Sequence, residues 1–368
     1  MMRDEVAVVG AGTAGLLAAK RLAELGIETQ VYDQKERPGI PVRASGILSI
    51  SGLETLGIDY RKVVTNTLCG AKLHMGSEVL NVRAPRPIAK VLDRFELNEL
   101  CYADAQKLGA RMITKSKVDG KLLESLNADK FIVGADGAVS VVARHFGFPE
   151  IPRHVLTYRA EYDYRLVESD MVELFFDNKM IPGFFGWISP NSKDVAEIGI
   201  GIDSASGNSR AAFERFKKVS EIAQIVAGGK IIGEGASIIP IGIRKHFVDD
   251  KRGVLLVGDA AGQVKPTTGG GIIFGGNGAR YAAQAISACI SKGASLEYYE
   301  RSWRKEFQKE MVLHSFFYNM YASMNSGQLA WMAKVLKFMG FEKFLAQYGD
   351  MDRPSLMIKR FLLRGLAK

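Results

Sequence analysis

Three glycines and one acid near the start of the chain have the types and spacing of a nucleotide-binding turn. Gly10, Gly12 and Gly15 follow the apolar run Val6–Val9, and Asp33 ends the next apolar segment. The first glycine permits a tight turn, the second lets the backbone approach a pyrophosphate, and the third lets a helix pack closely on a strand. An acid about 20 residues further on accepts hydrogen bonds from ribose hydroxyls. The pattern predicts a dinucleotide site; a turn with an incidental surface acid is the alternative.

A second acid and a second glycine-rich turn occur late in the chain. Asp259 follows the apolar run Val254–Val257 and Gly258, where an isolated carboxylate is costly unless it is paired or bound to a ligand. The segment Lys265–Ile272, which contains Gly269–Gly271, opens a helix whose unpaired N–H groups and positive dipole end face any bound group. This arrangement predicts a site for a polyol and for a flavin ring that gains negative charge on reduction. A glycine-rich loop kept only for close packing is the alternative.

The segments around these residues alternate between strand and helix. The glycine turn lies between the strand Val6–Val9 and a helix over Leu16–Leu25, and Ile27–Tyr32 supplies the next strand. Later members of the same unit are a helix at 94–108, strands at 131–133 and 253–257, and a helix at 279–290. We therefore expect an α/β unit whose parts are widely separated along the chain.

The middle of the chain has a different pattern, because apolar runs of strand length are separated by turn residues. The expected strands cover residues 156–163, 171–176, 184–188 and 195–202. A mostly antiparallel sheet inserted into the α/β unit is the simplest interpretation. From Tyr298 onward the chain reads as helical, aromatic and Met-rich, and its set Phe316, Phe317, Tyr318, Met320, Tyr321 and Met324 fits either a long apolar tunnel or an ordinary core helix.

Composition is that of an ordinary globular protein. The 368 residues are 47% hydrophobic and 24% charged, which fits two or three packing units and excludes extended disorder. A net charge of +9 indicates an anionic partner without identifying it. Three widely spaced cysteines without a CxxC pair predict neither a disulfide framework nor a metal site, so we expect a reducing, intracellular setting and no metal. The charge-free stretch Met311–Ala333 is too polar for a membrane-spanning helix.

Taken together, these residues resemble the FAD-binding elements of the glutathione-reductase-type, hydroxylase-like flavoproteins. The likeness includes Arg94, Ala135-Asp136-Gly137, and Gly258–Gly262 with Pro266. Within that group the chain is similar to the archaeal geranylgeranyl reductases. The narrower likeness rests on Pro41-Val42-Arg43, and on Phe185-x-Trp187-x-x-Pro190 followed by Gly199-x-Gly201. The resemblance covers almost the whole chain, including Gly349–Ser355 near its end.

The resemblance implies an α/β fold with a Rossmann-like FAD-binding domain of the glutathione-reductase/hydroxylase type. That domain is split by an antiparallel-sheet substrate domain and followed by a helical C-terminal region. We expect residues 1–65, 90–150 and 235–297 to form the FAD-binding domain, residues 66–89 and 151–234 to form the substrate domain, and residues 298–368 to form the C-terminal region.

The resemblance also implies which residues contact the cofactor and the substrate. The expected FAD contacts are Gly10, Gly12, Gly15, Asp33, Ala44, Ser45, Arg94, Val118, Asp259, Gly271 and Ile272. Phe185 and Trp187 match the aromatic residues that line the family's lipid pocket, and core packing on a strand is the alternative. Many family members carry a cysteine where this chain has Ala44, so the sequence names no catalytic residue and leaves open a paralogue with another substrate.

The implied activity is an FAD-dependent reduction that saturates C=C bonds of geranylgeranyl chains in archaeal membrane-lipid precursors, either digeranylgeranylglycerophospholipid or a related isoprenoid. Saturating an isolated alkene requires a hydride from reduced flavin and a proton, yet none of the five histidines has sequence context that ties it to the flavin. Only one full dinucleotide fingerprint occurs, so we expect an external electron donor such as ferredoxin, NAD(P)H or another reductant. The alternatives are an FAD-dependent monooxygenase of the aromatic-hydroxylase type and a non-enzymatic prenyl-lipid-binding escort.

The end of the chain predicts a contact with a membrane. If Ser355–Lys368 is helical, Arg360, Arg364 and Lys368 lie on one face, and Ile358, Leu362 and Leu366 point the opposite way. Such a helix can rest on an anionic membrane, and a solvated helix packed on the domain is the alternative. We expect a cytoplasmic protein, or one peripheral to the inner face of the cell membrane. No nucleic-acid partner is expected, because basic residues are not interleaved with stacking aromatic residues.

Overall fold

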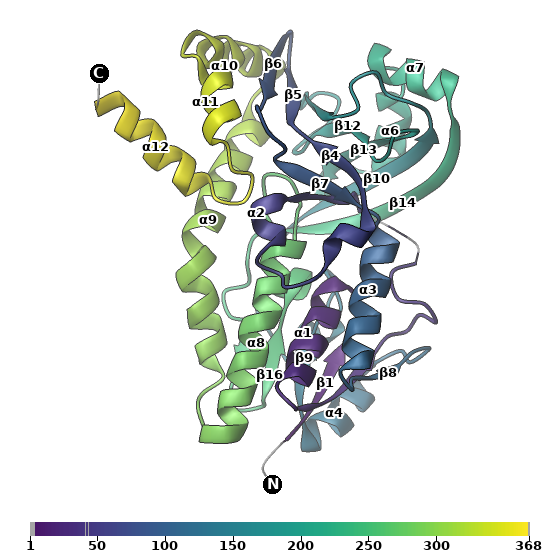
Figure 1. The fold of residues 1–368 in the computed structure, drawn as a ribbon, viewed down its shortest axis with the longest axis vertical. Coiled ribbons are helices and arrows are strands. Elements are labelled where there is room, and N and C mark those ends of the chain that lie inside the picture. The colour runs from purple at the N-terminus through teal and green to yellow at the C-terminus, as the bar shows by residue number, and fades with distance from the viewer. Residues whose placement is uncertain (1–3, 41, 43, 367–368) are drawn as a thin grey trace.

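The computed structural model describes residues 4–40, 42 and 44–366, with side chains placed up to residue 361, and it is shown in Figure 1. Of the positions that carried the sequence motifs, Pro41, Arg43, Lys368 and the side chain of Arg364 lie outside the described part. The chain forms a lower α/β unit, an upper sheet unit, and a series of C-terminal helices along one side (Figure 1).

The α/β unit is built on a six-stranded sheet with the order β15-β16-β9-β1-β2-β8. Its strands are β1 (Glu5–Val9), β2 (Glu28–Tyr32), β8 (Arg111–Ile113), β9 (Lys130–Gly134), β15 (Val248–Asp249) and β16 (Val254–Leu256). The pairs are parallel except β15 with β16. Central β1 reads as a continuous apolar run, because both of its faces are covered by other elements. The predicted α/β fold is confirmed.

Helices cover this sheet and carry several of the residues expected at the site. They are α1 (Thr13–Glu24), α3 (Arg94–Lys107), α4 (Gly120–Asp129), α5 (Val141–His145) and α8 (Ile272–Lys292), and the short helix η3 (Gly258–Ala261) precedes α8. Helix α1 begins three residues before the sequence-based expectation, because extended Gly12 is its N-cap. Gly10 has a φ of +103°, and a Cβ there would lie 2.5 Å from the carbonyl oxygen of Ala135. Both features require glycine at that turn.

The upper unit contains a seven-stranded sheet with the order β14-β10-β13-β12-β11-β5-β6. Its strands are β5 (Gly70–Met75), β6 (Glu78–Arg83), β10 (Arg153–Asp163), β11 (Met171–Phe176), β12 (Gly186–Pro190), β13 (Val195–Asp203) and β14 (Lys230–Ile241). All neighbours are antiparallel except β11 and β5, so the expected, mostly antiparallel sheet is confirmed. Strand β12 begins two residues later than the apolar run that predicted it.

The two faces of this sheet pack against different partners. One face packs on α6 (Ser209–Phe216) and α7 (Ser220–Gly228), with η2 (Ser204–Ser206) leading into α6. The other face carries Phe185 and Trp187 and packs against the C-terminal helices. A separate three-stranded sheet joins β3 (Ile47–Ser49), β7 (Ala89–Leu92) and β4 (Val64–Leu68), next to α2 (Ile50–Leu53) and η1 (Tyr60–Val63).

The C-terminal region is helical, as expected. It consists of α9 (Glu297–Ser323), α10 (Ser326–Phe338), α11 (Phe341–Tyr348) and α12 (Pro354–Leu366). Helix α9 runs beside α8, and α10 to α12 lie together at the upper left of Figure 1. The charge-free stretch is interrupted at Asn325, where a capping box with Gln328 starts a new helix. Among the described residues, no helix is both long enough and apolar enough to cross a membrane.

Candidate functional site

The glycine turn is held open by two polar side chains from other elements. The carboxylate of Asp33 accepts hydrogen bonds from the backbone N–H groups of Ala11 and Lys35, both at 2.8 Å. The side-chain amide of Asn98 donates to the carbonyl of Ala11 at 3.1 Å. Asn98 lies one helical turn after Arg94 on α3, and this spacing was the available sequence signal for a residue that we did not predict.

The glycines at the turn have different surroundings. A Cβ on Gly15 would collide with the backbone oxygen of Gly10, so this glycine allows α1 to pack closely on the turn. A Cβ on Gly12 would meet no described atom within 4 Å. The open side of the turn is therefore at Gly12, where a pyrophosphate is expected to approach the backbone.

Arg94 supplies a buried positive charge beside this turn. Its Nη2 donates to the hydroxyl of Thr13 at 3.2 Å, while its Nε and Nη1 are buried and have no hydrogen-bond partner among the described residues. Burial lowers the pKa of Arg94 to about 10. A buried guanidinium with two unpartnered N–H groups is costly unless an acceptor is present. A bound anionic group would satisfy both, so the arrangement fits the cofactor that the sequence predicted.

Asp259 lies near enough to Arg94 for their charges to influence each other. Burial raises the pKa of Asp259 to about 6, and the nearby charge of Arg94 opposes that rise. Asp259 also lies against the start of α8, because a Cβ on Gly271 would be 2.9 Å from its Oδ1. Helix α8 has no side-chain cap, so its first N–H groups remain available to a ligand at the point where Gly271 and Ile272 were predicted to bind the flavin.

The remaining predicted cofactor residues lie next to these groups. Backbone hydrogen bonds from Asp33 N–H to Ile113 and from Ser116 N–H to Asp33 bring the loop that carries buried Val118 beside Asp33. The Leu92 N–H donates to Gly46 at 2.9 Å, so Ala44 and Ser45 lie close to the start of α3. Hydrogen bonds thus join Asp33 to the glycine turn and Arg94 to Thr13 at the start of α1, and the charges of Arg94 and Asp259 influence each other.

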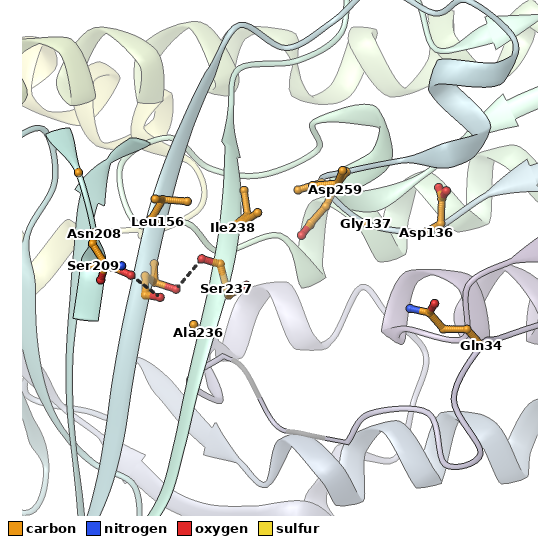
Figure 2. A pocket seen from close by; sticks show the side chains of 14 residues that line it. Gln34, Asp136, Gly137, Leu156, Asn208, Ser209, Ala236, Ser237, Ile238 and Asp259 are labelled. Atoms are coloured by element: carbon orange, nitrogen blue, oxygen red, sulfur yellow. Dashed lines mark hydrogen bonds between the residues drawn. The ribbon is translucent and has the colours of Figure 1, made fainter. Parts of the chain in front are cut away.

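A cavity of 840 Å³ opens beside Asp259, between the two units of the protein. Figure 2 shows Asp136, Gly137 and Asp259 on one side of it, and Leu156, Ser237 and Ile238 of β10 and β14 on the other. Its lining includes several polar side chains. Phe185 and Trp187 are not among the described residues that line it.

Phe185 and Trp187 instead belong to an aromatic cluster under the large sheet. They are 5% and 9% exposed, and their ring centroids are 6.0 Å apart. Tyr318 and Tyr321 from α9 complete the cluster, whereas Phe316 on the same helix is 60% exposed. The cluster is compatible with both sequence-based interpretations of Phe185 and Trp187, so their role as lipid contacts stays a prediction.

Next to Trp187 lies a buried ion pair that we did not predict. Arg159 Nη1 and the indole N–H of Trp187 both donate to the fully buried carboxylate of Glu197, each at 2.8 Å. Arg159 also donates to the carbonyl of Val42 at 2.8 Å, and its charge contributes to lowering the pKa of Arg94. The network therefore lies where the large sheet approaches the candidate cofactor site. Its two charged residues lie next to apolar residues along ordinary strands, so no sequence pattern indicated that they point inward.

A second buried ion pair lies behind the glycine-rich start of α8. Lys265 Nζ is 2.6 Å from Asp352 Oδ1, and the two side chains are 5% and 6% exposed. The hydroxyl of Ser49 also donates to Asp352. Burial acts to raise the pKa of Asp352, but Lys265 and Ser49 hold it below its ordinary value. Nearby His314 contacts the hydroxyl of Thr267 at 2.8 Å, and burial with the charge of Lys265 lowers the pKa of His314 to about 4.

Comparisons with known proteins agree with this geometry. Residues 98–314, more than half of the chain, match the family described as FAD binding domain, and residues 8–45 match the family described as NAD(P)-binding Rossmann-like domain. A digeranylgeranylglycerophospholipid reductase of Methanothermobacter thermautotrophicus is 29% identical over 92% of this chain and 92% of its own length. Another, from Methanothrix thermoacetophila, is 27% identical over 85% of this chain and 86% of its own length.

Solved structures show the same fold. A geranylgeranyl bacteriochlorophyll reductase-like protein from Thermoplasma acidophilum has a TM-score of 0.79 and 20% identity, over 96% of this chain and 98% of its own. The p-nitrophenol 4-monooxygenase of Pseudomonas putida has a TM-score of 0.73 and 18% identity, over 97% of this chain and 98% of its own. Because one fold carries both a reductase-like protein and a monooxygenase, substrate and reaction must be argued from the site and from the sequence relatives.

Proposed function

The chain belongs to the FAD binding domain family, and from that premise we propose that it is an FAD-dependent oxidoreductase that saturates C=C bonds of geranylgeranyl chains in archaeal membrane-lipid precursors. The observation that supports the cofactor is the buried guanidinium of Arg94 beside the glycine turn, whose Nε and Nη1 have no hydrogen-bond partner among the described residues. The substrate class follows relatives named digeranylgeranylglycerophospholipid reductases, which align over most of the chain. The exact substrate is digeranylgeranylglycerophospholipid or a related isoprenoid.

The residues of this chain would hold the cofactor at both ends. Bound FAD, once reduced, supplies the hydride for the alkene. Asp33 accepts hydrogen bonds from ribose hydroxyls, and Arg94 donates to the anionic part of the cofactor. Asp259 would accept a hydrogen bond from the polyol part of the cofactor. The uncapped start of α8 would face the flavin ring, which gains negative charge on reduction. Gly10, Gly12, Gly15, Ala44, Ser45, Val118, Gly271 and Ile272 complete the proposed set.

We place the lipid chain at the face of the large sheet that carries Phe185 and Trp187. This face supplies the aromatic cluster, and Arg159 connects it to Val42, two residues before Ala44. With Ala44 at the position of the family's cysteine, the chemistry proceeds without a thiol there. His314 does not serve as a protonated acid near neutral pH, because its pKa is about 4.

Two further parts of the proposal concern partners. The electron donor is external, namely ferredoxin, NAD(P)H or another reductant. A peripheral contact with a membrane, through the C-terminal helix α12, would bring the enzyme to its lipid substrate.

An anaerobic single-turnover experiment tests the reductase. The purified protein is checked for FAD by its absorption spectrum, reduced with dithionite and mixed with digeranylgeranylglycerophospholipid, and the lipid is then analysed by mass spectrometry. We expect reoxidation of the flavin together with a gain of hydrogen pairs in the lipid. Bound FAD with unchanged lipid would refute the substrate assignment. Oxygen-dependent NAD(P)H consumption with a hydroxylated product would indicate the monooxygenase, and lipid binding without FAD would indicate the escort.

A further inference from the structure

Helix α10 turns large apolar side chains toward the outside of the protein. Trp331 is 67% exposed and Phe338 is 94% exposed, and Met339 follows directly at 55%. Lys334 shares the face of Trp331 and Phe338, because the three residues are spaced at i, i+3 and i+7. Its side chain is 66% exposed, and its Nζ lies 3.9 Å from Glu78 Oε1, a loose ion pair. We call Trp331, Lys334, Phe338 and Met339 the outer face of α10. Adjacent large apolar side chains this exposed mark an interaction surface.

The opposite side of the same helix belongs to the interior. Leu329 and Ala333 are fully buried and join the aromatic cluster that contains Phe185 and Trp187. The helix is also firmly held, because Lys337 pairs with Glu78 of β6 at 2.7 Å and a capping box fixes its first turn. One rigid helix therefore separates the exterior from the place where we put the lipid chain, and its outer face is not a frayed end.

The charges around α10 identify the kind of partner. Residues 331–368 contain eight Lys or Arg and three Asp or Glu, and each of the three acids contacts another group of the protein. Asp352 pairs with Lys265, Asp350 accepts the N–H of Arg353, and Glu342 accepts the N–H of Asn81. In contrast, the basic residues Lys343, Lys359 and Arg360 are exposed. This end of the protein thus presents aromatic side chains surrounded by positive charge.

We propose that the outer face of α10 docks on an anionic lipid bilayer, with Trp331 and Phe338 inserted at the interface. Aromatic side chains favour the headgroup level, and neighbouring lysines are attracted by anionic headgroups. A second copy of this chain fits less well, since a two-fold contact would place this basic surface against itself. The inference rests on the proposed lipid substrate and adds the surface through which the protein reaches it. In this inference the main membrane contact is made by α10, and not by α12.

Tryptophan fluorescence tests the docking directly. The chain has three tryptophans, and Trp187 and Trp303 are 9% and 0% exposed, so only Trp331 can pass from water into lipid. We expect a blue shift of the emission when vesicles containing phosphatidylglycerol are added. The shift should be smaller with phosphatidylcholine alone and should diminish at high salt. An unchanged spectrum with either vesicle would overturn the proposal.

Variants separate the candidate surfaces. In vesicle co-sedimentation, Trp331→Ala with Phe338→Ala should weaken partition by at least about tenfold, as expected when two large apolar side chains lose their burial. The matched control is Val312→Ala with Phe316→Ala, two side chains of α9 that are 56% and 60% exposed, and it should partition like the unchanged protein. The double variant Arg360→Gln with Arg364→Gln tests α12. If it loses more vesicle partition than the α10 variant does, the membrane contact is made mainly by α12 and the proposal for α10 is wrong.

Two checks keep the result interpretable. The FAD content and the urea midpoint of each variant show whether it folds. Sedimentation velocity without lipid measures self-association. If the unchanged protein is a dimer and the Trp331 and Phe338 substitutions make it monomeric, the partner of this face is a second copy of the chain and not a bilayer. Because vesicle binding is measured without turnover, docking with no lipid reduction would refute only the proposed function, and lipid reduction without docking would refute only this inference.

Discussion

The buried carboxylate of Asp259 is expected to lower the free energy of unfolding at neutral pH, although we propose that it binds the cofactor. In the folded protein burial raises its pKa from 3.8 to about 6, so the carboxyl binds its proton more tightly when the chain is folded. Its contribution to stability is therefore most favourable below about pH 4 and is lost as the pH rises to about 6. Asp259→Asn should make the FAD-free protein more stable at pH 7, by about 1–3 kcal/mol, and should weaken FAD binding.

Urea denaturation of the FAD-free protein at several pH values measures this effect. The stability gained by Asp259→Asn should grow between pH 4 and pH 6 and stay constant above that range. Asp194→Asn, at an exposed acid, serves as the control and should show no such pH dependence. A variant that is less stable than the unchanged protein at pH 7 would contradict the cost assigned to the buried charge.

Glu197 is expected to matter for stability far more than its neighbour Glu161. Both carboxylates contact Arg159 Nη1, at 2.8 Å and 3.1 Å, but Glu197 is fully buried while the side chain of Glu161 is 27% exposed. Glu197→Gln leaves the buried guanidinium without its main counter-charge and should cost about 3–5 kcal/mol. Glu161→Gln should cost less than about 1 kcal/mol. Chemical denaturation compares the two, and equal losses would show that burial does not set the difference.

Candidate site residues could be predicted from the sequence where the backbone conformation or the burial of a position restricts the residue types allowed there. Gly10, Gly15, Asp33 and Asp259 could be selected as candidates because a tight turn, a close approach or a carboxylate after an apolar strand limits which residues are tolerated. Arg159 and Lys265 could not be identified in the same way. Their partners Glu197 and Asp352 lie 38 and 87 residues away, and only the folded topology brings them together.

At the scale of elements, two glycines of one turn should respond differently to the same substitution. Gly15→Ala places a methyl group against the backbone of Gly10, so α1 must shift, and the variant should lose several kcal/mol of stability together with FAD. Gly12→Ala meets open space and should fold normally, with a similar urea midpoint, yet bind FAD at least about tenfold more weakly because the methyl group occupies the path of the pyrophosphate.

Far-ultraviolet circular dichroism and FAD titration together check this pair. If Gly12→Ala binds FAD as tightly as the unchanged protein, the cofactor does not approach the backbone at this turn. If Gly15→Ala unfolds no more readily than Gly12→Ala, close packing of α1 on the turn is not what requires the third glycine.

Elements with a strong local pattern were predicted, and elements held by distant partners were not. Strands β10 to β13 of the large sheet and the helices α1 and α3 each carry their own periodicity or cap, such as Asp93 before α3. Strands β5, β6 and β14 of the same sheet were not predicted. The small sheet was missed because β3 has three residues and pairs with β7, which lies about 40 residues further along the chain. The start of α10 was missed because the charge-free composition continues across it, although Asn325 and Gln328 form a recognisable capping box.

At the scale of the whole molecule, the pair Lys265 and Asp352 connects the end of the chain to the flavin site. Ser49 and Asp352 contribute from segments 303 residues apart, and Lys265 Cε would lie 2.9 Å from a Cβ on Gly270, in the turn that starts α8. The C-terminal region would therefore set the charge next to the proposed cofactor site. Because the ammonium and the carboxylate offset each other, changing either one alone should alter the reduction potential of bound FAD.

The two single substitutions should shift that potential in opposite directions. Asp352→Asn leaves the positive charge of Lys265, which favours the reduced, more negative flavin, whereas Lys265→Gln leaves the carboxylate of Asp352, which disfavours it. We expect each to change the ratio of reduced to oxidised flavin by about tenfold, or about 30 mV for a two-electron couple, in spectroelectrochemical titration. The double variant keeps the site neutral and should return close to the original potential. Shifts of the same sign in both single variants would mean that loosened packing, and not charge, connects the C-terminal region to the cofactor.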